Sequence, residues 1–433
     1  SGHAPKYSET IKRHVAETLA FLGAFGSKLQ AAASIDVTSS VDRIVSSVLS
    51  PTCTWHRWAS IASRLPLLAE ASPRSFLNSV RSDLSKTEPE LVTLLHEEED
   101  SLFGRCNHAG LLWALETLAW PKSLLPEVAQ SLLVLASRDA PEGKWGNRPS
   151  STLCEILLHW LPQTTATVEE RIQVLDLLIQ TDRNAVWPIL INLLPDSAGG
   201  VSHPTHRPYW RNWANEWVEG ATTAESLAFM TATAERVVTE AGVNVERWKQ
   251  IFENIGRFPY IVHEQLLDGL ESLCDTDISD TNRRILSDKL SEQINRHRYF
   301  ASSHWALPSG IVDRLEGVLT RLKPCDPVFR HAWLFADWPD RFFQRGGDHS
   351  DNEAALETAR MEALQEILEQ QGFDGVEALL EEASAPHVVG SALAKATKDK
   401  YVADVLPVYL ERQPRQLDLA FGFIWARQHT DGW

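Results

Sequence analysis

Apolar residues spaced three and four apart recur along most of the 433-residue chain, and this period constrains the fold more than any other feature. The first such set is Ile11, Val15, Leu19 and Leu22. This spacing places side chains on one face of an amphipathic helix, whereas a half-buried strand needs strict alternation. No alternating segments flank an Asn-Gly or Asp-Gly step, the usual signal of a β-hairpin. The sequence therefore predicts an all-α fold.

Proline and capping signals divide these helices into pairs. The apolar-periodic segment 108–120 stops at Pro121, and segment 124–139 follows after three residues. A second pair is STLCEILLHWLP and TVEERIQVLDLLIQTD, where Thr167 and Glu170 have the spacing of a capping box. Each pair exposes an apolar face that only neighbouring pairs can cover. We expect a degenerate helical-hairpin repeat stack, a HEAT- or TPR-like α-solenoid.

Two Gly- and Pro-containing loops interrupt the helical pattern, at 196–213 and 337–352. They serve as predicted boundaries of an N-terminal, a middle and a C-terminal helical segment. These segments are 4–200, 201–340 and 341–433. Ser1–His3 is typical of an affinity-tag remnant, which favours a fragment of a longer chain.

Charge and cysteine usage exclude several classes of function. The chain has 41 Lys and Arg against 58 Asp and Glu, a net charge of −17. Such a surface repels nucleic acid and anionic lipid. The five cysteines are far apart and form no Cys-x-x-Cys pair, which favours a reducing, cytoplasmic location. No apolar run approaches the ~20 residues needed to span a membrane.

Motifs for catalysis or cofactor binding are absent from the sequence. No phosphate-binding GxxxxGK[ST] or GxGxxG, no GxSxG and no HExxH occurs. The acidic run 97–100 fits a solvated helix face, and Asp280 in CDTDISD fits a helix N-cap. His203 and His206 in HPTH lack a nearby third ligand. We therefore expect no enzyme activity, no cofactor and no metal.

The sixteen tryptophans suggest an alternative function. A carbohydrate-active α/α-toroid enzyme would use Trp rings as sugar platforms and paired carboxylates as acid and base. Most of these Trp residues lie on apolar helical faces, which favours packing between helices. Trp160 is expected to pack at the corner between the second pair of helices.

One cluster of aromatic and Arg residues is a candidate contact surface for a partner. In RPYWRNWANEW, Trp210, Trp213 and Trp217 have the spacing of one helical face, with Arg207 and Arg211 adjacent. Trp and Arg are the residues most enriched at binding hot spots. The alternative is that this face docks onto the protein's own helices.

A second cluster, NRHRYF, combines Arg296, Arg298 and Tyr299. A basic-aromatic patch can hold nucleic acid by charge and stacking. On a chain of net charge −17, these Arg residues are expected to pair with the protein's own acids. The same residues are kept as candidates for contact with a protein partner.

Several apolar phrases resemble the helical-repeat portions of large multidomain bacterial proteins of the STAND ATPase class, used in antiviral defence. They include WASIASRLPLLAEASPRSFLNSV, LLWALETLAW and PHVVGSAL, and the resemblance spans about residues 55–395. It implies a non-enzymatic sensor that binds a protein partner, such as a viral protein. It also implies effector and nucleotide-binding domains elsewhere in a longer chain. Because no Walker motif is present, ATP hydrolysis is not expected of these residues.

Overall fold

A computed structural model of the chain describes residues 7–29, 36–96, 106–139, 146–195, 203–339, 349–397, 409–410 and 414–431. Within these ranges the protein is all-α and contains no strand, which confirms the predicted fold class. Contacts divide the chain into an N-terminal unit (1–240 and 257–262) and a C-terminal unit (241–256 and 263–433). The three segments predicted from the sequence stay a prediction beside this division. The acidic run 97–100, Trp145 and Trp433 lie outside the described residues.

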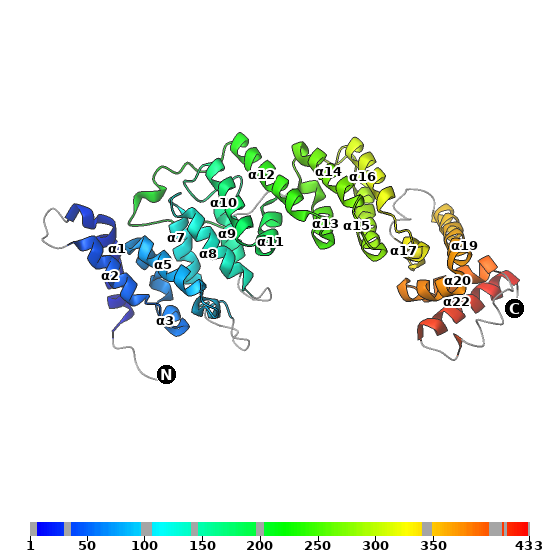
Figure 1. Cartoon of the computed structure of the whole chain (residues 1–433), viewed down its shortest axis with the longest axis horizontal. Coiled ribbons are helices and arrows are strands. Elements are labelled where there is room, and N and C mark those ends of the chain that lie inside the picture. The colour runs from blue at the N-terminus through cyan, green and yellow to red at the C-terminus, as the bar shows by residue number, and fades with distance from the viewer. Residues whose placement is uncertain are drawn as a thin grey trace. The chain divides into compact units, whose positions relative to one another are not determined.

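The N-terminal unit is a two-layer stack of helical hairpins (Figure 1). In one layer α1 packs on α4 and α4 on α7; in the other α2 packs on α5 and α5 on α8. The pairs α1 with α2, α4 with α5 and α7 with α8 join the layers, which confirms the predicted hairpin stack. The bounds are α1 Glu9–Leu29, α2 Val37–Val48, α3 Trp55–Ser60, η1 Ala62–Arg64, α4 Leu65–Ala71, α5 Pro73–Leu84, α6 Glu90–Thr93, α7 Ala109–Ala119, α8 Leu125–Ser137, α9 Pro149–Leu157, α10 Val168–Thr181, α11 Arg183–Leu193, η2 Asn212–Ala214, α12 Thr223–Ala241 and η4 Tyr260–Val262.

The second predicted helix pair corresponds to α9 and α10. The capping box is present: Thr167 Oγ1 accepts the Glu170 N–H at 3.3 Å, and Glu170 Oε2 accepts the Thr167 N–H at 2.9 Å. The first helix is shorter than predicted, because Leu158 leaves the helical conformation well before Pro162. The turn after α9 is then fixed by the Thr165 N–H, which donates to Trp120 O at 2.9 Å.

The C-terminal unit continues the pattern of helices packed on their neighbours in the chain (Figure 1). Its bounds are α13 Val245–Glu253, α14 His263–Cys274, α15 Asp280–Tyr299, α16 Ser309–Leu322, α17 Pro327–His331, η5 Ala332–Phe335, α19 His349–Glu382, α20 Pro386–Thr397 and α22 Pro414–Asp431; the short η3 Ile255–Arg257 straddles the two units along the chain. Gly372 breaks α19 with a φ of 65°. The sequence predicts this break, since 352–372 and 374–384 read as separate amphipathic segments.

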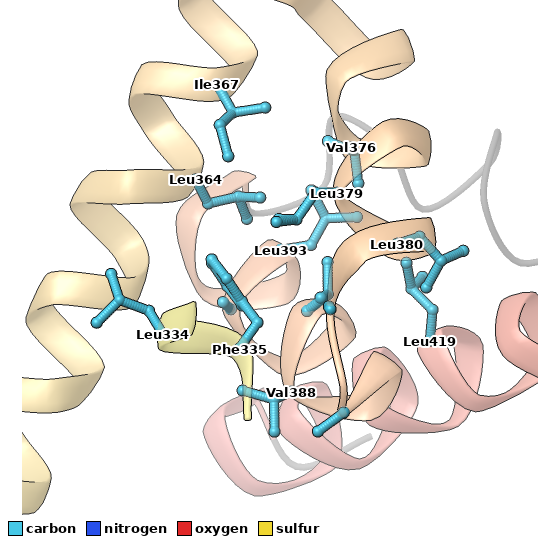
Figure 2. Packing of buried hydrophobic residues seen from close by; sticks show 14 of the residues in the cluster. Leu334, Phe335, Leu364, Ile367, Val376, Leu379, Leu380, Val388, Leu393 and Leu419 are labelled. Carbon is cyan, nitrogen blue, oxygen red and sulfur yellow. The ribbon is translucent and has the colours of Figure 1, made fainter. Parts of the chain in front are cut away.

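An apolar core holds α19, α20, α22 and η5 together (Figure 2). Phe335 is completely buried and packs in one cluster with Leu364, Leu379 and Leu419. Figure 2 shows these side chains converging from helices of different parts of the sequence. Burial of apolar area on this scale is the main favourable contribution to the stability of the C-terminal unit.

Helices α20 and α22 cross at backbone contact. A Cβ atom added at Gly390 would lie 2.0 Å from Leu419 O, and one at Gly422 would lie 2.0 Å from His387 O. Since a side chain has no room at either position, this crossing requires glycine on both helices. The groove described below forms beside it.

Several sequence predictions on packing can be compared directly with the structure. Trp58, Trp120 and Trp248 are buried between helices, as the packing interpretation expects. The N-cap of α15 is Ser279, so the predicted cap at Asp280 is wrong. The Asp280 carboxylate instead accepts the N–H groups of Cys325 and Asp326, each at 2.8 Å, because these amides lie across from the first turn of α15. None of the five cysteines, all of which the structure describes, forms a disulfide.

Candidate functional site

Residues 203–221, which we call the strap, run across the helices of the N-terminal unit. Only Asn212–Ala214 forms a short 3₁₀ turn there, so the predicted helical face of Trp210, Trp213 and Trp217 is wrong. The strap contacts α9, α7, α4 and α1 in that order, the reverse of the chain order. It then returns to the turn after α9, where the Ala221 N–H donates to Trp160 O at 2.9 Å.

The Glu70 carboxylate, at the end of α4, holds the middle of the strap. Oε1 accepts the N–H of Tyr209 at 3.1 Å, and Oε2 accepts those of Trp210 at 2.7 Å and Arg211 at 3.2 Å. Glu70 is only 3% exposed, and this burial raises its pKa while the three N–H donors act to lower it. One carboxylate therefore accepts hydrogen bonds from three consecutive backbone donors of the strap.

Arg211 fastens the strap to the crossing of α1 and α4. Its guanidinium donates to Glu70 O at 2.6 Å, Gly23 O at 3.0 Å and Ala71 O at 3.3 Å. A Cβ atom at Gly23 would lie 1.9 Å from Ala71 O, so the two backbones touch at this point. Arg211 thus satisfies carbonyls that the end of α4 leaves without helical partners. It is a structural residue of the fold.

Glu116 on α7 holds the beginning of the strap. Its Oε2 accepts the His206 N–H at 2.9 Å and lies 3.0 Å from His206 Nδ1. The imidazole stacks on the Trp113 ring at a centroid distance of 4.6 Å. From the other side, Trp120 Nε1 donates to His206 O at 2.9 Å. The imidazole is therefore positioned by a buried carboxylate and an aromatic ring.

The predicted aromatic-Arg cluster contacts the protein's own N-terminal unit. Trp217 donates to Pro162 O at 2.8 Å and meets Trp120 edge-on at 5.3 Å. Arg207 lies 4.5 Å from the Trp217 ring centroid and 5.3 Å from that of Trp120. These contacts correspond to the alternative interpretation of the cluster, in which it docks onto the helices.

The two remaining tryptophans of that cluster also have partners in the N-terminal unit. Trp210 meets Phe21 of α1 edge-on at 5.8 Å, and its Nε1 is buried without a hydrogen bond. The Arg211 guanidinium lies 5.1 Å from the Trp213 ring centroid. A role of these residues in contact with another protein stays a prediction.

The second predicted cluster lies at the end of α15. The Arg298 guanidinium donates from Nη2 to Asp313 Oδ1, and from Nε to Glu316 Oε1 at 3.1 Å. Arg296 lies 5.0 Å from the Trp305 ring centroid. Tyr299 is 66% exposed. Since Arg298 already pairs with two acids, the cluster offers little positive charge to a phosphate backbone.

A polar pocket of about 350 Å³ lies between α7, α9 and the beginning of the strap; we call it the α7–α9 pocket. Glu116, Glu155 and the stacked pair of Trp113 and His206 line it. The residues of the described chain that line this pocket include no Lys or Arg. Among these described residues, the imidazoles of His203 and His206 are the groups that can carry positive charge beside the two carboxylates.

Glu155 is the less constrained of the two carboxylates. Burial, the largest influence, raises the pKa of Glu155, as does nearby Glu116, while the backbone N–H and the charge of His203 lower it. Its Oε2 is buried and has no hydrogen-bond partner. An unsatisfied buried acceptor in a cavity is unfavourable for the empty protein and available to a donor from outside.

A second depression of about 550 Å³, the α20–α22 groove, lies in the C-terminal unit beside the glycine crossing. Met361 and Val388 contribute apolar lining, and Phe421 and Trp425 lie along it at 56% and 57% exposure. Glu357 and Lys395 on its wall form an ion pair of 2.5 Å. The groove thus combines exposed aromatic rings with charges of both signs.

The sequence predictions did not include Glu70, which holds the strap, Glu116 of the α7–α9 pocket, or Phe421 of the α20–α22 groove. Glu70 and Glu116 each stand within an otherwise apolar helix, in LPLLAEA and AGLLWALETLA. A lone carboxylate on a buried helical face needs a partner from elsewhere, and this was the available signal. The exposure of Phe421 and Trp425 has no comparable signal, because α22 is only weakly amphipathic.

Comparison with protein-family models, curated proteins and solved structures finds no match to the chain. In the part of the chain that the structure describes, no three His, Cys, Asp or Glu side chains are grouped to bind a metal ion. None of its described helices has the length and apolar character needed to cross a bilayer.

Proposed function

We propose that the chain is a recognition region that binds a protein partner through the α20–α22 groove. The observation that carries this proposal is the pair Phe421 and Trp425, both more than half exposed and both lining the same groove. Trp is among the residues most enriched at interface hot spots, and large apolar side chains are costly to leave in water. The proposal includes the sensor role implied by the resemblance to STAND defence proteins.

The occupant that fits best is an amphipathic helix of the partner. The groove lies along the crossing of two helices and has apolar lining from Met361 and Val388. Glu357 and Lys395 add opposite charges that can match polar positions flanking the apolar face of a helix. An apolar centre with a polar rim is the usual anatomy of a protein interface, and helix-in-groove binding uses it.

Selection of a displayed library of helical peptides against the protein tests this proposal. Peptides with apolar residues at helical spacing should be enriched. Trp425→Ala should weaken their binding by about 2 kcal/mol or more, roughly thirtyfold. Tyr299→Ala is the matched control, because Tyr299 is an exposed aromatic residue of the same unit outside the groove.

Two outcomes would contradict the groove as the site. One is equal binding of the selected peptides to the wild type and to Trp425→Ala. The other is loss of binding in Tyr299→Ala alone, which would favour the cluster at the end of α15. Self-association that Trp425→Ala abolishes would instead identify a second copy of the chain as the occupant.

A carbohydrate-active enzyme is the second candidate, because Glu116 and Glu155 line one pocket together with Trp113. It ranks lower, since Glu116 Oε2 already accepts the His206 N–H and contacts Nδ1 of that residue. Hydrolysis of p-nitrophenyl glycosides that disappears in Glu155→Gln would reverse this order.

A further inference from the structure

The α7–α9 pocket lies in the N-terminal unit, separate from the groove of the proposed function, and apart from the lower-ranked carbohydrate alternative it has no assigned ligand. We propose that it binds a guanidinium group, as presented by an arginine side chain. The inference is independent of the groove and goes beyond it. Four observations support it: the charge of the pocket, an unsatisfied acceptor, its size and its aromatic wall.

Charge gives the first argument. Glu116 and Glu155 lie close enough for the charge of one to raise the pKa of the other, and the described lining residues include no Lys or Arg. The imidazoles of His203 and His206 offset part of the repulsion between the two carboxylates, and a bound cation between them would remove the rest. The net charge of −17 further attracts a positively charged ligand to the surface.

Hydrogen bonding gives the second argument. Glu155 Oε2 is buried without a hydrogen-bond partner, and so is the hydroxyl of Thr205, which lines the same pocket. The Thr152 hydroxyl is engaged, since it lies 3.4 Å from both Glu116 Oε1 and Asn147 Oδ1. A guanidinium group carries five N–H donors and no acceptor, so it matches a site rich in acceptors.

Size and shape favour guanidinium over other cations. A volume of about 350 Å³ is at the small end of ligand pockets and suits one side chain rather than an oligosaccharide. The wall contains the Trp113 ring stacked on His206, and planar guanidinium groups pack well on aromatic faces. A metal ion would require a third grouped ligand, and the described residues provide no such group.

Calorimetric titration with N-acetyl-arginine amide tests the proposal on the full chain. Binding is expected for the wild type, and Glu155→Gln should weaken it by at least about tenfold. Glu169→Gln is the matched control, since Glu169 is an exposed carboxylate on neighbouring α10. The uncharged isostere N-acetyl-citrulline amide should also bind at least about tenfold more weakly.

Thermal unfolding separates a binding role from a structural one. If Glu155 serves a ligand, Glu155→Gln should raise the unfolding temperature of the empty N-terminal unit by about 1 to 3 °C, because it removes repulsion with Glu116. A merely structural Glu155 would give a lower unfolding temperature in the variant.

Three results would overturn the proposal. They are the absence of binding up to about 10 mM arginine amide, unchanged binding in Glu155→Gln, and equal binding of the citrulline compound. Tighter binding of N-acetyl-lysine amide than of N-acetyl-arginine amide would be a fourth such result, because it contradicts the guanidinium assignment. Because Trp425→Ala leaves this pocket intact, failure here and failure of the groove are recognised separately.

Discussion

The two units use different means to hold their helices together. Among the described residues of the N-terminal unit, three carboxylates are buried, those of Glu70, Asp83 and Glu116, and two of them bind the strap. In the described part of the C-terminal unit no carboxylate is buried, and an apolar core centred on Phe335 holds its helices. Its acids instead form ion pairs at the surface, such as those of Arg298. Helices of the same repeat-like fold are therefore held together by buried carboxylates in one unit and by apolar packing in the other.

The largest expected effect is on the stability of the C-terminal unit. Phe335→Ala should destabilise the C-terminal unit by about 4 kcal/mol, because it leaves a cavity in a completely buried cluster. Hydrogen exchange measured by mass spectrometry resolves the two units and should show no change in α1 to α11. Phe300→Ala, at an exposed position of the same unit, should cost less than about 1 kcal/mol. A change in the exchange of both units would contradict the separation.

The second-largest expected effect is on the stability of the N-terminal unit. Glu70→Ala should destabilise the N-terminal unit by about 3 kcal/mol, since three part-buried N–H groups lose their charged acceptor. Exchange of residues 209–211 should accelerate, with no change in the C-terminal unit. Glu70→Gln should cost less, because an amide oxygen in place of Oε2 retains two of the three bonds. Equal losses in the Ala and Gln variants would show that the strap does not depend on this acceptor.

The smallest expected effect is a difference between the two units in how their stability depends on pH. His297 is buried and accepts the Leu307 N–H through Nδ1 at 3.1 Å. Desolvation, then Arg296 and His263, lowers the pKa of His297 from 6.5 to about 4. The unfolded chain therefore takes up this proton first as the pH falls, and stability is lost between pH 6.5 and about 4.

Urea unfolding of the C-terminal unit at pH 7 and pH 5 measures this effect, expected to be about 1 to 2 kcal/mol. His297→Asn should flatten the dependence. In the N-terminal unit, burial raises the pKa of Glu70 and lowers that of His159, so their contributions have opposite signs and a weaker dependence is expected. A steeper loss in the N-terminal unit would contradict this comparison.

Local sequence patterns predicted the helices, whereas contacts between residues far apart in the chain could not be predicted from such patterns. The capping box at Thr167 and the break at Gly372 depend on neighbouring residues, so the sequence reveals them. The spacing of Trp210, Trp213 and Trp217 was also local, but it misled, because Glu70 holds their backbone in a non-helical path. That contact joins residues about 140 positions apart, and no periodicity encodes such a partner.

The strap also has a consequence for biosynthesis. Glu70 and Tyr209 are 139 residues apart, so at about 5 to 20 residues per second a ribosome needs roughly 7 to 28 seconds to synthesise the intervening chain. Throughout that interval the Glu70 carboxylate lacks its three donors from the strap. The N-terminal unit can therefore complete its fold only after residues 209–211 have been synthesised. The rate of translation, rather than the formation of its helices, sets the time of this step.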